Sequence, residues 1–199
     1  MKPVALITGG QQGIGLGIAE ALSDAGFAVA LASRSKPEEE SAVSALEKLG
    51  PEARYYRHDV SDIGNVAHLL DAIEADLGPV DCLVSNAGVP ARVRGDILEI
   101  TPDNFDFVLD VNLRGAFFLA QHAARRMAAR ETGTYRSIIF VTSVSAEMVS
   151  IERAEYCISK AGAAMMAELF SVRLAPLGIG KGRTVEAVVA DWLRDNEAT

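Results

Sequence analysis

Short runs of apolar residues alternate along the chain with longer segments in which apolar residues recur every three or four positions, the spacing of a helix. The short runs predict strands at Val4–Thr8, Phe27–Ala32, Arg54–Arg57, Val80–Ser85 and Ser137–Thr142, of which Arg54–Arg57 is the weakest. The longer segments predict helices at Ile14–Ala25, Pro37–Leu49, Ile63–Leu77, Pro102–Arg130 and Ala154–Leu174. The segment Pro102–Arg130 is long enough to hold two helices that turn near Asp110.

Nearly continuous apolar strands that are separated by helices are typical of a parallel sheet buried on both faces. Because crossovers between parallel strands are right-handed, this order predicts a doubly wound α/β fold, a three-layer αβα sandwich. Proline and glycine fall at the ends of the predicted elements rather than in a linker. The 199 residues therefore predict a single domain over residues 1–199.

Composition and charge narrow the class of protein. Hydrophobic residues make up 49% and charged residues 23% of the chain, as in ordinary globular proteins. The net charge of −8 argues against nucleic acid or an anionic membrane as a partner. Cys82, Cys157 and three histidines show no disulfide or metal-ligand spacing, and no apolar run has the length of a signal peptide or a membrane span. We expect a cytoplasmic protein without a metal.

A glycine-rich turn follows the first predicted strand, with the sequence TGGQQGIG over residues 8–15. Glycines at such a turn let the backbone approach a pyrophosphate at the N-terminus of the next helix. The turn predicts a dinucleotide site with these residues: Gly9, Gln11, Gln12, Gly13, Ile14 and Gly15. The alternative is a plain connection between a strand and a helix.

This turn resembles the TGxxxGIG pattern of the short-chain dehydrogenase/reductase family. The segment Ser85–Gly88 resembles the NNAG motif of that family, and Asn112 matches its helix asparagine. Ser143 lies 13 residues before Tyr156, which opens a complete YxxxK motif ending at Lys160. The helix that follows is similar to that of members named 3-oxoacyl-[acyl-carrier-protein] reductases. The resemblance implies a Rossmann-type fold that binds NAD(P).

The residue types at these positions suit proton transfer to a carbonyl oxygen. Tyr156 and Lys160 are four residues apart and share one face of the predicted helix. A free phenol has a pKa of about 10, and a neighbouring ammonium lowers such a pKa toward neutrality. The resemblance implies that Ser143 hydrogen-bonds the substrate oxygen and that Asn112 holds a water linked to Lys160. Ser145 is a competing serine with the wrong spacing from Tyr156.

The end of the second predicted strand bears on the choice of cofactor. In NAD enzymes an acidic residue about 20 positions beyond the glycine turn binds the ribose hydroxyls. Ser33 stands there in place of a carboxylate, and Arg34 follows, which can pair with a 2′-phosphate. The sequence therefore favours NADP(H) over NAD(H); the alternative is that Arg34 is a solvated charge and either cofactor serves.

The resemblance adds further residues to the expected cofactor site. It implies that Asp59, rather than His58, lies against the adenine. The expected cofactor-binding residues beyond the glycine turn are Ser33, Arg34, Asp59, Val60, Asn86, Ala87, Gly88, Tyr156 and Lys160.

The resemblance breaks after the last predicted helix. Leu174–Gly180 still resembles the turn toward a sixth strand, but Lys181–Leu193 is similar to the last helix of the family. The sequence therefore predicts neither a sixth-strand and lid region nor the last strand. Either the polypeptide lacks these segments or the sequence as read joins the residues that flank them. We favour the second explanation, because deleting an interior strand would expose an apolar sheet edge.

Together these patterns predict an NADPH-dependent oxidoreductase that reduces a ketone, a 3-oxoacyl compound or a similar carbonyl, to a secondary alcohol. The alternatives are an NAD-dependent alcohol or sugar dehydrogenase and a nucleotide-binding scaffold without turnover. We expect Val89–Arg94 and Ser145–Ile151 to contribute to substrate binding. Pro102–Arg130 and Ala154–Leu174 carry more small and apolar residues than one buried stripe requires. The resemblance implies that these two helices pack against their copies in a homodimer or homotetramer; the alternative is that every apolar position faces the sheet.

Overall fold

Six parallel strands form one sheet in the order β3-β2-β1-β4-β5-β6. The computed structural model describes residues 2–130 and 135–180. The strands are β1 (Val4–Thr8), β2 (Ala28–Ser33), β3 (Ala53–Arg57), β4 (Val80–Ser85), β5 (Arg136–Phe140) and β6 (Ile179–Gly180). The strand order reverses between β1 and β4, and in open α/β sheets the crevice at such a point is where ligands bind.

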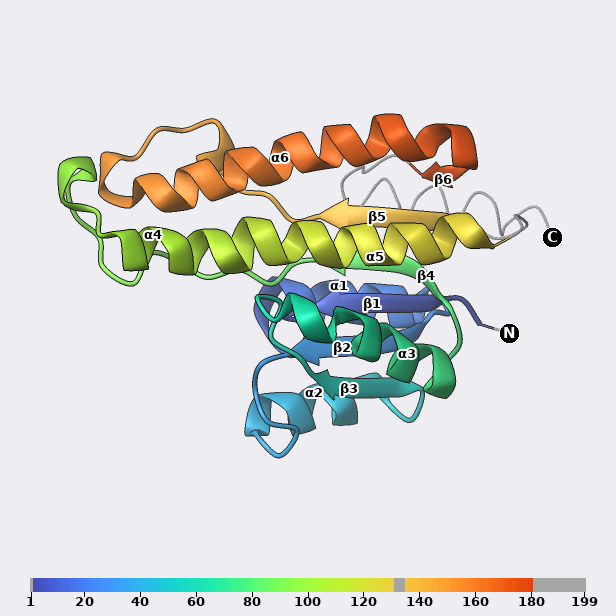
Figure 1. Cartoon of the computed structure of the whole chain (residues 1–199). Helices are drawn as coiled ribbons and strands as arrows, with labels where there is room; N and C mark the ends of the chain where they lie inside the picture. The colour runs from blue at the N-terminus through green and yellow to red at the C-terminus, as the bar shows by residue number, and fades with distance from the viewer. Residues whose placement is uncertain (1, 131–134, 181–199) are drawn as a thin grey trace.

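Helices cover both faces of the sheet (Figure 1). The helices are α1 (Gly13–Asp24), α2 (Glu40–Leu49), α3 (Val66–Asp76), α4 (Pro102–Leu109), α5 (Ala116–Ala129) and α6 (Ala154–Leu174). Short 3₁₀ turns lie at Ile63–Asn65, Ile97–Glu99, Val144–Ala146, Ile151–Arg153 and Ala175–Leu177. Helices α1 and α2 pack on one face of the sheet, and α3, α5 and the end of α6 pack on the other.

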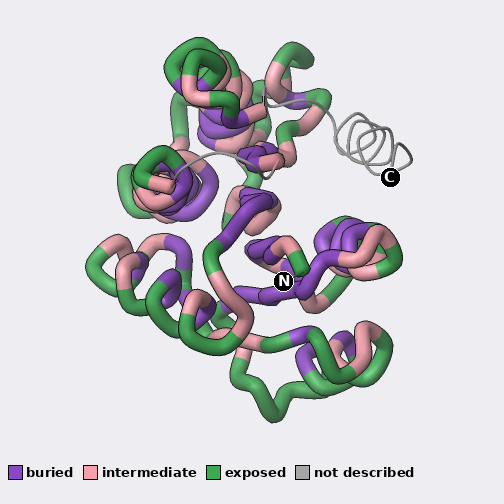
Figure 2. The backbone as a smooth tube through the Cα atoms, turned by 90° about the vertical axis from the view of Figure 1, so that its right-hand side faces the viewer, coloured by how far each residue is buried: buried purple, intermediate pink, exposed green. Residues whose placement is uncertain are grey.

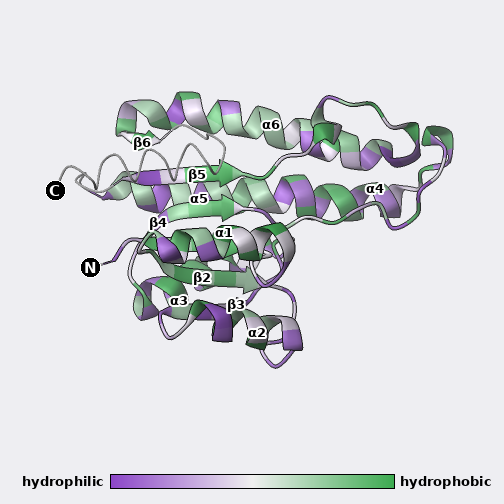
Figure 3. Cartoon of the chain, turned by 180° about the vertical axis from the view of Figure 1, so that it is seen from behind, coloured by the Kyte–Doolittle hydropathy of each residue, from purple (hydrophilic) through white to green (hydrophobic). Residues whose placement is uncertain are grey.

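The alternation of side chains along each strand divides the core into two layers. In β1, Val4 and Leu6 face the layer of α3 and α5, whereas Ala5 and Ile7 face α1. Figure 2 shows the buried strands between helices whose outer surfaces are exposed, and Figure 3 shows the corresponding change from apolar to polar residues. The predicted three-layer αβα sandwich is confirmed.

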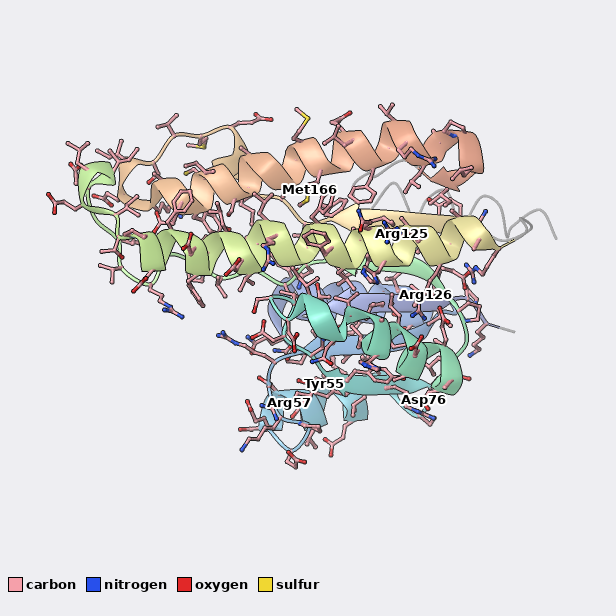
Figure 4. All side chains as sticks on the ribbon, viewed as in Figure 1. Tyr55, Arg57, Asp76, Arg125, Arg126 and Met166 are labelled. Atoms are coloured by element: carbon pink, nitrogen blue, oxygen red, sulfur yellow. The ribbon has the colours of Figure 1, made fainter. Side chains whose placement is uncertain are left out.

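An ion-pair cluster joins two helices on one face of the sheet. Arg126 of α5, labelled in Figure 4, reaches across to α3. Its Nη2 lies 2.6 Å from Asp71 Oδ1 and its Nη1 lies 3.0 Å from Glu74 Oε2.

Within residues 2–130 and 135–180, no helix is long and apolar enough to cross a membrane.

The long predicted helix Pro102–Arg130 does not turn near Asp110. Instead α4 continues into a π-helical segment, Asp110–Gly115, and then into α5. Backbone angles stay helical on both sides of this segment, so the three pieces follow one another without a loop. A Cβ on Gly115 would collide with the carbonyl oxygen of Val60, so glycine allows the loop after β3 to lie against the segment. Such π-helical turns occur frequently at functional sites.

The sequence predicted no sixth strand, but the structure contains the beginning of one, so this prediction is wrong. Ile179 pairs with Arg136 and Gly180 with Ser137, in parallel, so β6 extends the sheet beside β5. The strand β6 follows the left-handed Gly178 and has only two residues. A strand this short forms no recognisable apolar run, so the sequence pattern did not predict it. The predicted last helix, Lys181–Leu193, lies outside the described residues.

Candidate functional site

The carboxyl ends of the strands open into two adjoining cavities. The first has a volume of about 400 Å³ and the second about 280 Å³. In Figure 1 the strand arrows point toward this edge of the sheet. Both cavities are lined by Ile14, Asn86, Gly88 and Val89, so a single extended ligand can occupy both.

The two cavities collect all the residues that the sequence assigned to cofactor binding. The first cavity is lined by the glycine turn and by the ends of β2, β3 and β4: Gly9, Gln11, Gln12, Gly13, Ile14, Gly15, Ser33, Arg34, Asp59, Val60, Asn86, Ala87 and Gly88. The second cavity is lined by Tyr156 and Lys160 of α6. Residues from five separate parts of the sequence thus meet at one edge of the sheet.

The glycine turn leaves a cradle in front of the N-terminus of α1. The side chain of the N-cap residue Gln12 does not cap the helix, and the first turn of α1 carries no acidic residue. The first N–H groups of the helix are therefore free for an anion. A Cβ on Gly15 would collide with the Gly9 carbonyl oxygen and lie 2.5 Å from Asn86 Nδ2. The glycines keep this space open in front of the helix N–H groups, so the cradle fits the diphosphate of a dinucleotide.

Thr8 fastens the end of β1 to the end of β4. Its Oγ1 accepts hydrogen bonds of 3.0 Å from the backbone N–H groups of both Asn86 and Ala87. In return, Asn86 Nδ2 donates to the Thr8 carbonyl at 2.9 Å and to the Gly9 carbonyl at 3.2 Å. These bonds fix the floor of the site at the point where the strand order reverses.

A hydrogen-bond network from β3 shapes the loop that presents Arg34. The Tyr55 hydroxyl lies 2.8 Å from Ser33 Oγ and donates to the Ser35 carbonyl at 2.9 Å, while Ser35 N donates to Ser33 Oγ. The Arg57 Nε also donates to the Arg34 carbonyl at 3.4 Å. Tyr55 and Arg57 are labelled on β3 in Figure 4. The Arg34 side chain is exposed and forms no ion pair with any described residue.

Asp59 remains ionised at the edge of the first cavity. Partial burial raises the pKa of its carboxyl, but hydrogen bonds from Ser61 and the charges of Arg34 and His58 outweigh this and leave the pKa below its usual range. The two bonds come from Ser61 N at 2.9 Å and Ser61 Oγ at 2.7 Å. His58 is buried beside it, and burial lowers the pKa of its imidazole.

Tyr156 and Lys160 meet at the second cavity. Lys160 is buried and its Nζ donates a 2.9 Å hydrogen bond to the Val141 carbonyl at the end of β5. Burial lowers the pKa of Lys160. The same Nζ lies 5.9 Å from the centre of the Tyr156 ring. Within the described residues the Tyr156 hydroxyl has no hydrogen-bond partner, so it is available to a ligand.

Asn112 lies in the π-helical segment and holds the chain after β4. Its Oδ1 accepts from Val89 N at 2.7 Å, and its Nδ2 donates to the Val89 carbonyl at 2.9 Å and to Ser159 Oγ at 3.1 Å. A Cβ on Gly88 would lie 3.3 Å from Asn112 Oδ1 and 3.6 Å from Lys160 Nζ. Asn112 and Lys160 therefore converge on Gly88, although no direct hydrogen bond joins them.

Ser143 is half-buried and acts locally as a helix cap. Its Oγ accepts from Ser145 N at 3.2 Å at the start of the 3₁₀ turn Val144–Ala146, which leaves its hydroxyl proton free to donate. Ser143 lines neither cavity, but its neighbour Thr142 lines the second. The competing Ser145 is buried, with only 4% of its surface exposed.

A family model described as short chain dehydrogenase matches residues 3–188 of the chain. The chain belongs to this family. It is 33% identical over 184 residues to a probable NADP-dependent mannitol dehydrogenase from Yarrowia lipolytica, covering 92% of this chain and 64% of that protein. It is 32% identical over 194 residues to an acetoacetyl-CoA reductase from Shinella zoogloeoides, covering 97% of this chain and 75% of that protein.

Solved structures show the same likeness. A 3-oxoacyl-[acyl-carrier protein] reductase from Brucella melitensis in complex with NAD superimposes with a TM-score of 0.85 at 40% identity, over 96% of this chain and 78% of that one. The chain spans a little under two thirds of the length of several curated relatives, with shares of 64%, 63% and 62%.

Several residues of this short-chain dehydrogenase site were missed by sequence reasoning. The first cavity is also lined by Ala32, Ser35, His58 and Val111. Of the two segments expected to contribute to substrate binding, the first supplies Val89, Pro90, Ala91 and Arg94 to the second cavity, and none of residues 145–151 lines it. The position of Thr8 in the glycine motif could have indicated its place in the site. Nothing in the sequence indicates Tyr55, because its contact with Ser33 depends on strand pairing.

Proposed function

We propose that this protein is an NADPH-dependent reductase that converts a ketone into a secondary alcohol, with Tyr156 as the general acid. The observation that carries the proposal is the junction of the two cavities. The cradle for a dinucleotide continues directly into the space beside Tyr156 and Lys160, so a nicotinamide and a carbonyl group can meet there.

The chain's own residues hold the cofactor along the strand ends. The N-terminus of α1 would hold the diphosphate, Asp59 and Val60 the adenine, and Asn86–Gly88 the nicotinamide half, since all of these residues line the first cavity. The bound nicotinamide supplies the hydride. Every other part of the reaction belongs to protein side chains that bind, orient and protonate the substrate.

Tyr156 delivers the proton. Its hydroxyl donates to the substrate oxygen, and the neighbouring Lys160 ammonium stabilises the negative charge that remains on the phenol oxygen. Ser143 lies next to Thr142 at the border of the second cavity, and in this proposal its free hydroxyl proton turns toward the same substrate oxygen and orients it. Asn112 holds Val89 and the wall of the cavity near Lys160, which keeps the substrate space open.

Arg34 selects the phosphorylated cofactor in this proposal. Its side chain is exposed at the first cavity with no described ion pair, and no carboxylate stands at Ser33 to repel a 2′-phosphate. One relative carries NADP dependence in its name. A guanidinium on this loop therefore supports NADP(H).

A second candidate is an NAD-dependent alcohol or sugar dehydrogenase. The use of NAD is supported by the solved relative in complex with NAD. The relative named as a mannitol dehydrogenase supports only the sugar-type substrate, because its name gives NADP as its cofactor. The two candidates are separated by kcat/KM for NADPH and NADH with one ketone, and for NADP and NAD with the matching alcohol. Cofactor binding without any turnover in a broad ketone panel would instead support a scaffold.

We also propose that two copies associate through α5 and α6. A cavity of about 450 Å³ lies between these helices, lined among others by Phe117, Leu169 and Phe170. Arg125 of α5, which also lines this cavity, is labelled in Figure 4. Met165, Leu169 and Val172 of α6 are 58%, 58% and 76% exposed, an apolar surface that a second copy would cover. We expect a cytoplasmic homodimer, or a tetramer built from it.

A further inference from the structure

We propose that the substrate carries a carboxylate close to its carbonyl group and that Arg94 and Arg153 bind this carboxylate. This inference rests on the proposed function and names the substrate class of the same site, a keto acid rather than a neutral ketone, sugar or thioester.

The charges that line the second cavity are all of one sign. Arg94, Arg153 and Lys160 line it, and none of its lining residues in the described part of the chain is Asp or Glu. Lys160 points its ammonium at the Val141 carbonyl, so the two arginines remain for a ligand. On a chain with a net charge of −8, two arginines in a cavity whose lining contains no acidic residue need an explanation.

Arg153 is close to the reacting end of the site. Its guanidinium carbon lies 5.9 Å from the centre of the Tyr156 ring. No ion pair or side-chain hydrogen bond of Arg153 occurs within the described residues. Glu152, which directly precedes Arg153, is exposed and does not line the cavity, and Glu155 is buried and accepts a hydrogen bond from Asn104 Nδ2. Neither carboxylate forms an ion pair with Arg153 among the described residues.

A backbone contact brings the two arginines to the same place. Gly95 N donates to the Glu152 carbonyl at 3.2 Å. Arg94 directly precedes Gly95 and Arg153 directly follows Glu152, so the two arginines leave the backbone from adjoining segments, and both line the second cavity.

The loop that carries Arg94 is also tied to α4. Asn104 Oδ1 accepts from Arg92 N at 3.0 Å, and Asn104 Nδ2 donates to the Val93 carbonyl at 3.2 Å. Because Asn104 also binds Glu155, the loop, α4 and the start of α6 form one hydrogen-bonded unit. The backbone next to Arg94 is therefore held in place by hydrogen bonds where it borders the cavity.

The chemistry of guanidinium selects the ligand. Its planar N–H groups bind a carboxylate through two parallel charge-assisted hydrogen bonds. A neutral ketone or thioester would leave both arginines unpaired beside the substrate. Because Arg153 is near Tyr156, the carboxylate must lie only a few bonds from the carbonyl carbon.

The test compares small keto acids with their methyl esters as matched pairs, with the preferred cofactor at saturation. Since a hydrogen bond to a charged group contributes about 1.5–3 kcal/mol, we expect kcat/KM for the acids to exceed that for the esters by about tenfold or more. In Arg94→Gln and Arg153→Gln this ratio should fall toward one while kcat/KM for the esters changes little. Arg153→Lys, which keeps the charge without the planar fork, should retain an intermediate ratio.

The control is Arg54→Gln, an exposed arginine on β3 outside the second cavity, which should leave the ratio unchanged. Equal turnover of acids and esters by the wild type, or loss of both in equal measure in the variants, would overturn the inference and leave the proposed function intact. If neither is reduced, the proposed function fails. Calorimetric binding of the acid but not the ester to the cofactor-loaded protein would then still support the arginine site, and equal binding would overturn it.

Discussion

The Lys160 ammonium lies 5.9 Å from the centre of the Tyr156 ring and donates a 2.9 Å hydrogen bond to the Val141 carbonyl. Val141, which directly follows β5, thus positions the lysine, and one helical turn of α6 positions the tyrosine relative to it. This placement buries the ammonium group, and burial lowers the pKa of Lys160.

The lowered pKa predicts where turnover is lost at alkaline pH. A free lysine titrates near pH 10.4, so the buried Lys160 should lose its proton below that value, and the reduction rate should fall with it. In Lys160→Arg the cation stays charged throughout, so the variant, although slower, should not show this alkaline decline. The pH dependence of kcat for both proteins checks the prediction, and an identical decline in both would assign it to another group.

Arg34→Asp should change the preference between the two cofactors. The new carboxylate would repel a 2′-phosphate and accept hydrogen bonds from the ribose hydroxyls, so the Kd for NADPH should rise about tenfold or more. The Kd for NADH should stay the same or fall. Fluorescence titration measures both constants. An unchanged Kd for NADPH would show that Arg34 is only a solvated charge, and Arg54→Asp serves as the matched control.

How far the site follows from sequence depends on the range of the contacts involved. The glycine turn and the spacing of Tyr156 and Lys160 are local, because a turn and one helical turn fix their geometry. The bonds of Thr8 to Asn86 and of Tyr55 to Ser33 arise from strand pairing, which a single sequence does not display. The bond between Asn104 and Glu155 joins residues that are 51 positions apart.

The same reasoning explains the two errors in the fold. The π-helical segment Asp110–Gly115 keeps a helical apolar pattern, and its backbone angles, which stay helical, distinguish it from a turn between two helices. The strand β6 is recognised by its pairing with β5 rather than by its composition.

His58 should make stability depend on pH below neutrality. Burial lowers the pKa of its imidazole despite the opposing charges of Asp62 and Asp59, so the folded protein binds fewer protons here than the unfolded chain. The free energy of unfolding should therefore rise as the pH rises toward the ordinary histidine pKa of about 6.5 and fall as the pH drops below it. Urea unfolding across this range, compared between wild type and His58→Gln, measures the effect. The variant should show a shallower dependence, and an equal slope would contradict the assignment.

Leu169→Glu should separate the proposed dimer. Leu169 is 58% exposed in the single chain, so a charge at this position is compatible with folding but costly in an apolar interface. Sedimentation at micromolar concentration should give a dimer or tetramer for the wild type and a smaller species for the variant. Asp71→Asn, on an exposed part of α3, provides a control with unchanged assembly. A monomeric wild type would refute the interface.

The central claim is that Tyr156 supplies the proton for ketone reduction, and Tyr156→Phe tests it most directly. The measurement is ketone-dependent oxidation of NADPH or NADH by the purified full chain, together with the Kd of the cofactor. Since general acid catalysis contributes about 10²- to 10⁴-fold, we predict a loss of turnover of that size with an almost unchanged cofactor Kd. Turnover by the phenylalanine variant within about threefold of the wild type, far below that contribution, would contradict the account.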